Sequence, residues 1–373
     1  MLIGVDGNEA NVREKVGVSV YTLRLLQYFQ KHASKNLQFV VFLRSAPLKE
    51  LPDGTDFYSY KIIRSSFLWS QLFLPFELFK RIFTHPIDVF FSPAHYAPRF
   101  CPCPTVVTIH DVAYVHYPDE FLKRDLFQLT HWTRYSIKNA SKIISVSKTT
   151  KKDVIAQYNT TENKIEVIYN GFEKNITSKA RSLSSLSKQY HFNTPYILYV
   201  GTLQPRKNII TLIKSFAFFN KKHPEYSLVI VGKKGWLFDE IFKEARDQYV
   251  NNKIIFTGYV TDDELAVLYK NSHCFVLPSF YEGFGLPLLE AMSFGTPVIS
   301  SFASSLPEIG GEACLYFDPQ DPTDLFDKLE LLTYDPSLQK QLIAEGKKRT
   351  LTYSWNKCAK ETLAVLMSQV KRR

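Results

Sequence analysis

The feature that most restricts the fold is an alternation of short apolar segments with amphipathic helical segments, in two successive blocks. The first block contains FVVFLR, DVFFSP, TVVTIHD, KIISVS and IEVIYNG, and the second contains YILYVGTL, YSLVIVG, KIIFTGYV, CFVLPS and PVISS. Strands that alternate with helices are typical of a parallel, doubly wound sheet. We therefore predict an α/β fold with two Rossmann-like domains, and we expect substrate beyond the carboxyl ends of the strands, in a central cleft.

The length supports two domains, because 373 residues exceed one ordinary core. We expect an N-terminal domain over residues 1–175, a C-terminal domain over 176–354 and a final helix over 355–373. The polar stretch Glu173–Thr194 is interpreted as the connection between the domains. In the final segment, Trp355, Ala359, Leu363 and Leu366 form one apolar stripe at helical spacing.

Composition and charge exclude several classes of protein. The net charge of +10 fits an anionic substrate or an anionic membrane surface, but no nucleic-acid motif accompanies it. The five cysteines have neither metal-ligand spacing nor the pattern of a disulfide framework, which favours reduced thiols in the cytoplasm. The start MLIGVDGN has no basic leader, so we expect no signal peptide, and no apolar run is long enough to span a bilayer. The acidic TDDEL stretch is predicted to be a capping box at Thr261 and Glu264, so we expect no metal site.

The segment PSFYEGFGLPLLEAMSFGTPVISS carries the clearest chemistry. Pro287 suits the first turn of a helix, so Gly283 and Gly285 fall in the loop that enters it. Such a loop lets a ligand approach the backbone, and a helix N-terminus attracts anions, which predicts a phosphate cradle. Glu282 and Glu290 flank this cradle, where carboxylates are costly unless they accept hydroxyl hydrogen bonds. A nucleotide sugar supplies hydroxyls on both sides of its diphosphate.

The spacing of these residues resembles that of a known family. Glu282 and Glu290, separated by seven residues within this glycine- and proline-containing frame, resemble the signature of the large family of retaining glycosyltransferases with the GT-B fold. The resemblance implies that Glu290 holds the ribose hydroxyls and that Glu282 faces the transferred sugar. It also implies that backbone amides near Phe284, Gly285 and Leu286 hold the diphosphate and the sugar.

Two cations follow the first strand of the second block, in YVGTLQPRKNI. Arg206 and Lys207 stand near a helix N-terminus, where cations are poorly placed as partners of the helix dipole. A bound diphosphate would explain why two cations stand at this position. In the family, the matching pair neutralises the leaving diphosphate, which implies a reaction without metal or cofactor.

Four further residues match the family in the first block. His110, at the end of a predicted strand, is implied to contact the transferred sugar near its reacting carbon. Asp111 either orients His110 or caps the next turn, and Ser147 is either a helix N-cap or a residue on the acceptor side. Gly17 stands alone where many members have two or three glycines that face the donor diphosphate. In the second block, backbone groups near Gly258 are expected to read the nucleotide base.

Together these features predict a retaining hexosyltransferase that uses a GDP- or UDP-linked sugar. The resemblance also implies that the N-terminal domain binds the acceptor, that the C-terminal domain binds the nucleotide sugar, and that the final helix packs back on the N-terminal domain. Mannose is favoured, with glucose and N-acetylglucosamine as alternatives, and the acceptor is a saccharide or a lipid-linked saccharide of cell-surface glycoconjugate synthesis. A nucleotide-sugar 2-epimerase of the same fold and a non-catalytic interaction protein remain alternatives. The apolar segment Phe67–Phe83, which ends near Lys80 and Arg81, is interpreted as membrane contact at the inner face, as first-domain core or as an acceptor-site wall.

Overall fold

The computed structural model describes residues 1–65, 68–173 and 181–370, apart from the side chain of residue 251. It divides into two compact units. Unit 1 comprises Met1–His116, Lys123–Gly171 and Tyr353 to the C-terminus, and unit 2 comprises Tyr117–Leu122 and Phe172–Thr352. The expected boundary between residues 175 and 176 lies outside the described residues.

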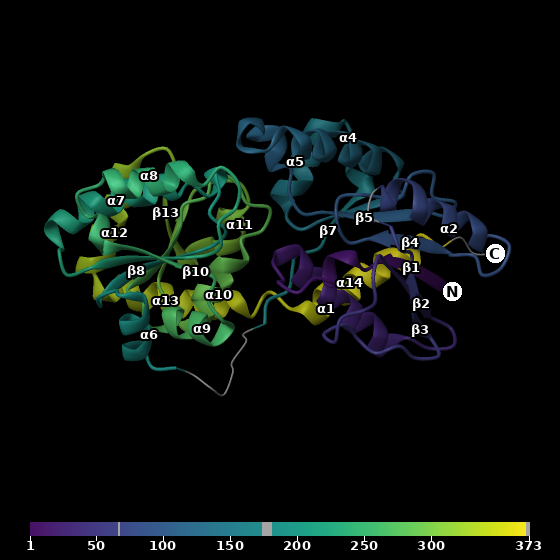
Figure 1. Cartoon of the computed structure of the whole chain (residues 1–373), viewed down its shortest axis with the longest axis horizontal. Helices are drawn as coiled ribbons and strands as arrows, with labels where there is room; N and C mark the ends of the chain where they lie inside the picture. Colours follow the sequence, from purple (N-terminus) through teal and green to yellow (C-terminus); the bar gives the residue numbers. More distant parts are fainter. Residues whose placement is uncertain (66–67, 174–180, 371–373) are drawn as a thin grey trace. The chain divides into compact units, whose positions relative to one another are not determined.

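Unit 1 contains a parallel sheet of seven strands in the order β3-β2-β1-β4-β5-β6-β7 (Figure 1). Its strands are β1 (Leu2–Asp6), β2 (Gln38–Leu43), β3 (Tyr58–Ile62), β4 (Val89–Ser92), β5 (Thr105–Ile109), β6 (Lys142–Ser145) and β7 (Ile165–Val167). Its helices are α1 (Gly17–His32), α2 (Leu74–Arg81), α3 (Ala113–His116), α4 (Lys123–Asn139), α5 (Lys148–Tyr158) and α14 (Trp355–Ser368), with short turns at Asn8–Ala10, Trp69–Phe73 and Glu162–Lys164.

Alternation along β2 shows why this sheet is covered on both faces. Phe39, Val41 and Leu43 join a core with α1 and α14, whereas Val40 and Phe42 pack on the other face with Trp69 and the apolar side of α2. All five side chains are buried, as expected for an inner strand of a parallel sheet. The final helix therefore belongs to the core of unit 1, which it enters through Ala359, Leu363 and Leu366.

Unit 2 contains a parallel sheet of six strands in the order β10-β9-β8-β11-β12-β13. Its strands are β8 (Tyr196–Val200), β9 (Ser227–Val231), β10 (Ile254–Gly258), β11 (Cys274–Leu277), β12 (Val298–Ser301) and β13 (Cys314–Phe317). Its helices are α6 (Leu183–Tyr190), α7 (Ile209–Lys222), α8 (Asp239–Asp247), α9 (Asp262–Asn271), α10 (Leu286–Phe294), α11 (Leu306–Gly310), α12 (Pro322–Tyr334) and α13 (Pro336–Thr350), with short turns at Pro118–Glu120, Pro205–Lys207, Asn251–Lys253 and Gly311–Ala313.

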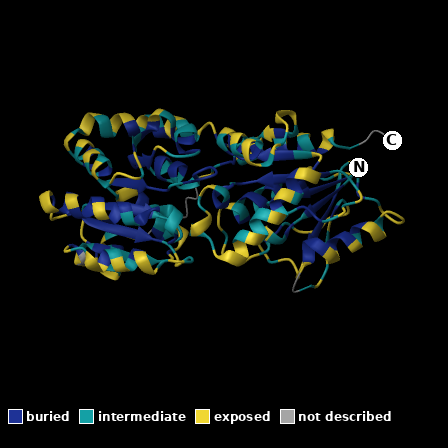
Figure 2. Ribbon diagram, turned by 90° about the horizontal axis from the view of Figure 1, so that it is seen from above, coloured by how far each residue is buried: buried dark blue, intermediate teal, exposed yellow. Residues whose placement is uncertain are grey.

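The helices of unit 2 form two layers, with α7, α8 and α12 on one side of the sheet and α9, α10 and α13 on the other (Figure 1). Figure 2 shows buried strands between helices whose outward faces are exposed. The two parallel α/β sheets confirm the predicted fold class. The predicted capping box at Thr261 and Glu264 is also confirmed, because both reciprocal hydrogen bonds are present at the start of α9.

The interpretation of Glu173–Thr194 as a simple connection is wrong for its second half. Residues 183–190 form the helix α6, which packs against α9 and buries Leu186. The hydroxyl of Ser182 accepts a hydrogen bond from the amide of Ser185 and caps this helix. Serines are common in linkers, but one at an N-cap starts a helix when an apolar side chain one turn later can be buried. Residues 174–180 of the stretch lie outside the described part.

None of the described helices combines the length and the apolar character needed to cross a bilayer.

Candidate active site

Two loops of unit 2 meet at the point where its strand order reverses. The chain leaves β8 for α7 on one side, whereas β11 stands on the other side of β8 and continues toward α10. The carboxyl ends of such neighbouring strands are where open α/β sheets bind ligands. Hydrogen bonds join the two loops: the amide of Phe280 donates to the carbonyl oxygen of Arg206 at 2.9 Å, and Asn208 Nδ2 donates to the carbonyl oxygen of Pro278 at 3.0 Å.

The two predicted cations share one carboxylate in these loops. Lys207 Nζ lies 2.5 Å from Glu282 Oε1, and Arg206 Nη1 lies 3.7 Å from Glu282 Oε2. Burial opposes ionisation of Glu282, but the charges of Lys207 and Arg206 outweigh it and lower the pKa of the carboxyl group. The cluster therefore brings two positive charges to one carboxylate, and the charge of Arg206 also acts on Glu120.

The backbone and the carboxylate of Glu282 are fixed by serine hydroxyls. Ser279 Oγ donates to Glu282 Oε1 at 2.7 Å, and Ser305 Oγ donates to the carbonyl oxygen of Glu282 at 2.7 Å. The amide of Glu282 donates to Ser304 Oγ at 2.7 Å. With 8% of its surface exposed, Glu282 is a rigid buried acid rather than a solvated loop residue.

The N-terminus of α10 has the geometry of the predicted cradle. Gly285 is the N-cap with φ of +96°, and Pro287 stands in the first turn. Positive φ favours glycine, and a Cβ there would lie 2.7 Å from Leu306 Cδ2. The amides of Gly285 and Leu286 have no hydrogen-bond acceptor among the described residues, as is usual for the first amides of a helix. Phe284 is buried beside them.

Glu290 lies one turn further along α10. Its Oε2 accepts a hydrogen bond from the hydroxyl of Tyr269, on α9, at 3.0 Å. Burial raises the pKa of Glu290, although the Tyr269 hydrogen bond acts in the opposite direction. The other carboxylate oxygen has no partner among the described residues, so it is able to accept from a ligand hydroxyl. Gly258, at the end of β10, has φ of +73° and open space where a side chain would stand.

In unit 1, His110 follows β5 and is almost fully buried. Its Nε2 lies 2.7 Å from the carbonyl oxygen of Pro93, and its ring packs edge-on against Tyr21. Burial and the neighbouring His95 lower the pKa of His110 from 6.5 to about 4. The imidazole is therefore neutral near pH 7, and the contact with Pro93 requires the proton to be on Nε2, which donates to the carbonyl oxygen.

The surroundings of the other predicted residues of unit 1 are as follows. Asp111 Oδ1 accepts from the amide of Ala113 at 3.1 Å, as capping requires, and the charge of Asp111 also acts on His110, so both alternatives for this residue stay open. Ser147 is fully buried and caps α5, because its Oγ accepts from the amide of Thr150 at 3.1 Å. Gly17 begins α1 and is exposed, and a Cβ at this position would have no neighbouring atom within 4 Å.

Comparison with known proteins gives the family. Residues 186–349 match the family model for glycosyl transferases group 1, and residues 16–175 match the model for glycosyltransferase family 4. O-antigen chain mannosyltransferase B of Escherichia coli is 32% identical over 261 residues, which cover 69% of this chain and 68% of that protein. The chain belongs to the group 1 glycosyltransferases. O-antigen chain mannosyltransferase RfbU of Salmonella typhimurium is 33% identical over 217 residues, which cover 58% of this glycosyltransferase and 57% of the relative.

Solved structures agree on the fold of this glycosyltransferase. Sucrose-phosphate synthase from Thermosynechococcus elongatus superposes with a TM-score of 0.76 at 19% identity, over 98% of each chain. HepE from Anabaena, in complex with UDP and glucose, gives a TM-score of 0.73 at 17% identity, over 98% of this chain and 99% of that one. At such identities the likeness establishes the GT-B fold.

Sequence reasoning missed several residues that shape the candidate site. It did not foresee that Glu282 pairs with both cations, nor that Ser279 and Tyr269 hold the two glutamates. The order of β8 and β11 carries the missing information, because it brings together loops that are 75 positions apart. Ser279, three positions before Glu282 at a predicted strand end, was the one local signal in the sequence.

Proposed function

We propose that this glycosyltransferase transfers mannose from a nucleotide diphosphate sugar to a saccharide acceptor in the synthesis of a cell-surface polysaccharide. The two O-antigen chain mannosyltransferases among its relatives support this choice of sugar and pathway class, and they favour transfer over epimerisation or a non-catalytic role. The observation that carries the proposal is the cluster of Arg206, Lys207 and Glu282, whose two cations lie side by side in the loops at the carboxyl ends of β8 and β11.

The donor is proposed to lie along unit 2, with its diphosphate on the cation cluster and the first amides of α10. Charge-assisted hydrogen bonds from Arg206 and Lys207 would hold the phosphate oxygens. The free oxygen of Glu290 would accept from the ribose hydroxyls, while Tyr269 keeps that carboxylate in place. We propose GDP or UDP as the nucleotide, with the base near Gly258, and HepE shows that a protein of this fold binds UDP.

The proposed reaction retains the anomeric configuration. The bond between the anomeric carbon and the diphosphate oxygen breaks through an oxocarbenium-like transition state, and the electron pair passes to the leaving phosphate. The acceptor hydroxyl attacks from the same face and gives its proton to that phosphate. Arg206, Lys207 and the α10 amides would stabilise the developing charge, which is worth several kcal/mol in a site that excludes water. His110, neutral at pH 7, would contact the sugar without adding a competing positive charge.

Because these groups supply the positive charge, we propose that catalysis is independent of divalent metal and of any other cofactor. The test is transfer from GDP-mannose, UDP-glucose and UDP-N-acetylglucosamine to methyl α-mannoside, with and without EDTA. We expect GDP-mannose to be the best donor, EDTA to change the rate less than twofold, and NMR of the product to show an α-linkage from an α-donor. Glu290→Gln should raise the donor KM roughly tenfold or more, as expected for a lost charge-assisted hydrogen bond. Inversion, or strict dependence on added metal, would contradict the mechanism.

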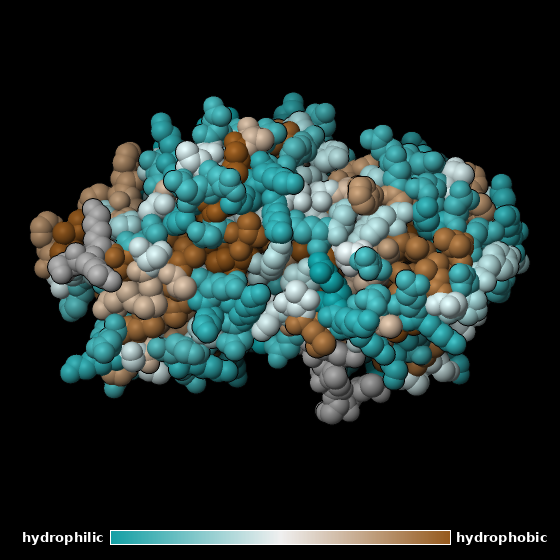
Figure 3. Space-filling model, turned by 180° about the vertical axis from the view of Figure 1, so that it is seen from behind, coloured by the Kyte–Doolittle hydropathy of each residue, from teal (hydrophilic) through white to brown (hydrophobic). Residues whose placement is uncertain are grey.

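We also propose peripheral membrane contact at the cytoplasmic face, where reduced cysteines and a lipid-linked acceptor would be found together. Its support is an exposed apolar surface around α2, formed by Leu72, Phe76, Phe83 and Phe100, of which 54%, 75%, 89% and 71% are exposed. Figure 3 shows apolar areas that interrupt the hydrophilic surface on one face of the molecule. Residue 67, the first of the predicted segment, lies outside the described residues.

The rest of that segment contributes both core residues and exposed apolar residues. Trp69, Leu74 and Leu78 are core residues of unit 1, whereas Phe76 and Phe79 line an open groove of about 510 Å³. Arg99 also lines this groove, and Lys80 follows Phe79 in the chain, which suits anionic lipid.

The membrane contact is tested with vesicles of phosphatidylglycerol. Phe76→Ser with Phe83→Ser should abolish sedimentation with these vesicles, while Leu351→Ser, at an equally exposed site of unit 2, should not. Equal sedimentation of both variants would refute the contact.

A further inference from the structure

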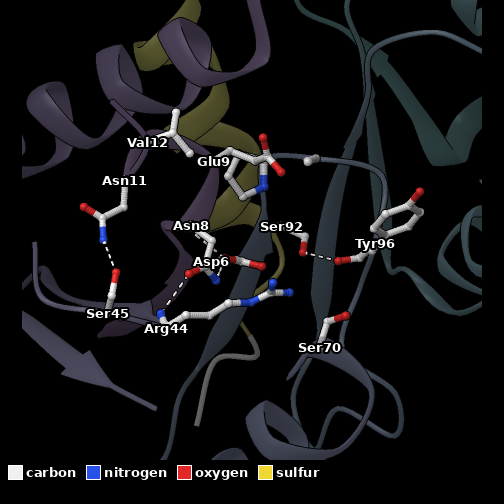
Figure 4. Close-up of a pocket in the computed structure, with 12 residues that line it drawn as sticks. Asp6, Asn8, Glu9, Asn11, Val12, Arg44, Ser45, Ser70, Ser92 and Tyr96 are labelled. Atoms are coloured by element: carbon white, nitrogen blue, oxygen red, sulfur yellow. Dashed lines mark hydrogen bonds between the residues drawn. The ribbon is translucent and has the colours of Figure 1, made fainter. Parts of the chain in front are cut away.

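Unit 1 contains a polar cavity of about 330 Å³ that the family signature does not include. It lies at the carboxyl ends of β1, β2 and β4, and Asp6, Glu9, Arg44 and Tyr96 are among the residues that line it (Figure 4). In this sheet the strand order reverses between β1 and β4. Open α/β sheets bind their ligands in the crevice at that reversal. The cavity is therefore at the ligand-binding position of unit 1.

The three charged groups of the cavity retain hydrogen-bonding capacity. Asp6 Oδ1 accepts from the amide and from the side chain of Asn8, at 3.1 and 2.8 Å, but Oδ2 has no donor among the described residues. Along the described chain, Glu9 makes no hydrogen bond and Arg44 makes no ion pair. The guanidinium of Arg44 lies 5.6 Å from the centre of the Trp69 ring, which limits where it can point. Figure 4 shows Asp6, Glu9 and Arg44 among the side chains around the cavity.

Burial adds an energetic reason for a ligand at this place. It raises the pKa of Asp6 to about 6, which means that the ionised carboxylate is poorly solvated. A ligand that donates hydroxyl hydrogen bonds would restore the interactions that the carboxylate loses on burial. Sugars present such hydroxyls around a ring, together with oxygens that accept from a guanidinium.

We propose that this cavity holds the terminal, uncharged saccharide unit of the acceptor, with Asp6 and Glu9 accepting from its hydroxyls and Arg44 donating to its oxygens. The proposal rests on the proposed transferase function. Two carboxylates against one guanidinium leave one negative charge in excess, so a phosphorylated or otherwise anionic sugar is disfavoured. The volume is at the small end of the range of about 300–1,000 Å³ for small-molecule sites, which suits one or two sugar units.

The position of His110 next to the cavity indicates that the ligand of the cavity is the acceptor rather than an unrelated molecule. Pro93 lines the cavity, and its carbonyl oxygen is the group that His110 Nε2 contacts at 2.7 Å. A saccharide in the cavity would thus lie one residue away from the histidine that the family resemblance assigns to the transferred sugar. Residues that hold the acceptor there would act on acceptor affinity and on the choice of acceptor.

The test measures KM for acceptor and donor separately in Asp6→Asn, Glu9→Gln and Arg44→Gln. The probes are methyl α-mannoside and its 6-phosphate. We expect the KM for methyl α-mannoside to rise about 10- to 100-fold, the range for a lost charge-assisted hydrogen bond, with the donor KM changed less than threefold. Glu50→Gln and Arg64→Gln, which replace exposed residues of unit 1 outside the cavity, should leave the acceptor KM unchanged. The wild type should prefer the neutral glycoside to its phosphate at least tenfold.

A second measurement is independent of turnover. Saturation-transfer NMR should detect methyl α-mannoside on the wild type and lose the signal in Glu9→Gln and Arg44→Gln, whose exposed side chains do not contribute to the core. An unchanged acceptor KM in all three variants, a preference for the phosphate, or no saturation transfer on the wild type would overturn the proposal. If no nucleotide sugar is turned over but the NMR signal depends on these residues, the proposed function fails and the saccharide site stands.

Discussion

The ion pair between Lys207 and Glu282 should contribute to the stability of unit 2, and Lys207→Met tests this. The side chains are only 14% and 10% exposed, and the charged atoms are 2.5 Å apart. Removal of one member of a buried pair commonly costs about 3–5 kcal/mol, because the other charge stays buried without its partner. Glu282 would keep the Ser279 hydroxyl at 2.7 Å and Arg206 at 3.7 Å. We therefore expect a loss of about 2–3 kcal/mol.

The assay must isolate unit 2, because a chain with two compact units does not unfold in one step. Hydrogen exchange in increasing urea, read by mass spectrometry on peptides from β8 and α10, gives the free energy of unfolding of this region. Lys348→Met provides the matched control, because Lys348 pairs with Glu345 at 2.7 Å but is 72% exposed. Exposed pairs contribute about 0–1 kcal/mol, so this variant should unfold almost as the wild type does.

A double-mutant cycle completes the experiment. Glu282→Gln alone removes the carboxylate that Arg206 and Lys207 share, and the double variant with Lys207→Met also removes the repulsion between these two cations. The coupling energy should be about 1–3 kcal/mol, as found for charged residues in contact. A loss in Lys207→Met no larger than in Lys348→Met, or a coupling energy near zero, would show that Glu282 does not depend on Lys207 and would refute the reasoning.

Three further predictions follow from buried groups and glycines. Because burial depresses the pKa of His110 from 6.5 to about 4, stability is highest above pH 6.5 and is lost as the pH falls toward 4. The loss should be about 3 kcal/mol. The Tm of the unit 1 transition, measured from pH 7.5 to 4, should fall less steeply in His110→Gln, whereas parallel curves would contradict this account. Gly285→Ala should destabilise unit 2 by about 1–3 kcal/mol, because the residue has a φ of +96° and its Cβ would lie against Leu306. Gly17→Ala should leave Tm unchanged, and it should lower turnover if the backbone of Gly17 contacts the donor diphosphate. Gly171→Ala should loosen α14, because its Cβ would lie 2.2 Å from the amide nitrogen of Trp355; faster hydrogen exchange in α14 would show it, and unchanged protection would refute it.

Regular elements of the core could be predicted from local pattern. The inner strands are nearly continuous apolar runs, such as YILYV in β8, and the turn between β11 and α10 is fixed by Gly285 and Pro287. Each of these signals is contained within a few residues. They were sufficient for the fold class, because the alternation of strand and helix is itself a local property repeated along the chain.

Elements that depend on distant partners were missed. The edge strand β3, YSYKI, is only partly buried and alternates weakly, so its pairing with β2 is what makes it a strand. The strand β13 has only the four residues CLYF and forms beside β12. Helix α6 depends on its packing against α9. In each case the decisive interaction joins segments that are far apart in the sequence or is supplied by another element.

The candidate site also depends on contacts between distant segments, and these contacts change the roles that its residues can have. The sequence assigns Arg206 and Lys207 to a diphosphate, and the family resemblance assigns Glu282 to the transferred sugar, as separate tasks. In the folded chain Glu282 is already the counter-ion of both cations, and it is anchored by Ser279, Ser304 and Ser305. A counter-ion fixed in this way holds two long, flexible cations in one place before a ligand arrives, so less side-chain entropy is lost on binding. It also means that a diphosphate must compete with a carboxylate for Lys207. If the donor binds there, Glu282→Gln should therefore bind the nucleotide more tightly in isothermal titration calorimetry and yet turn over more slowly, because the loss of the carboxylate strengthens attraction in the ground state while it releases the cations from their positions.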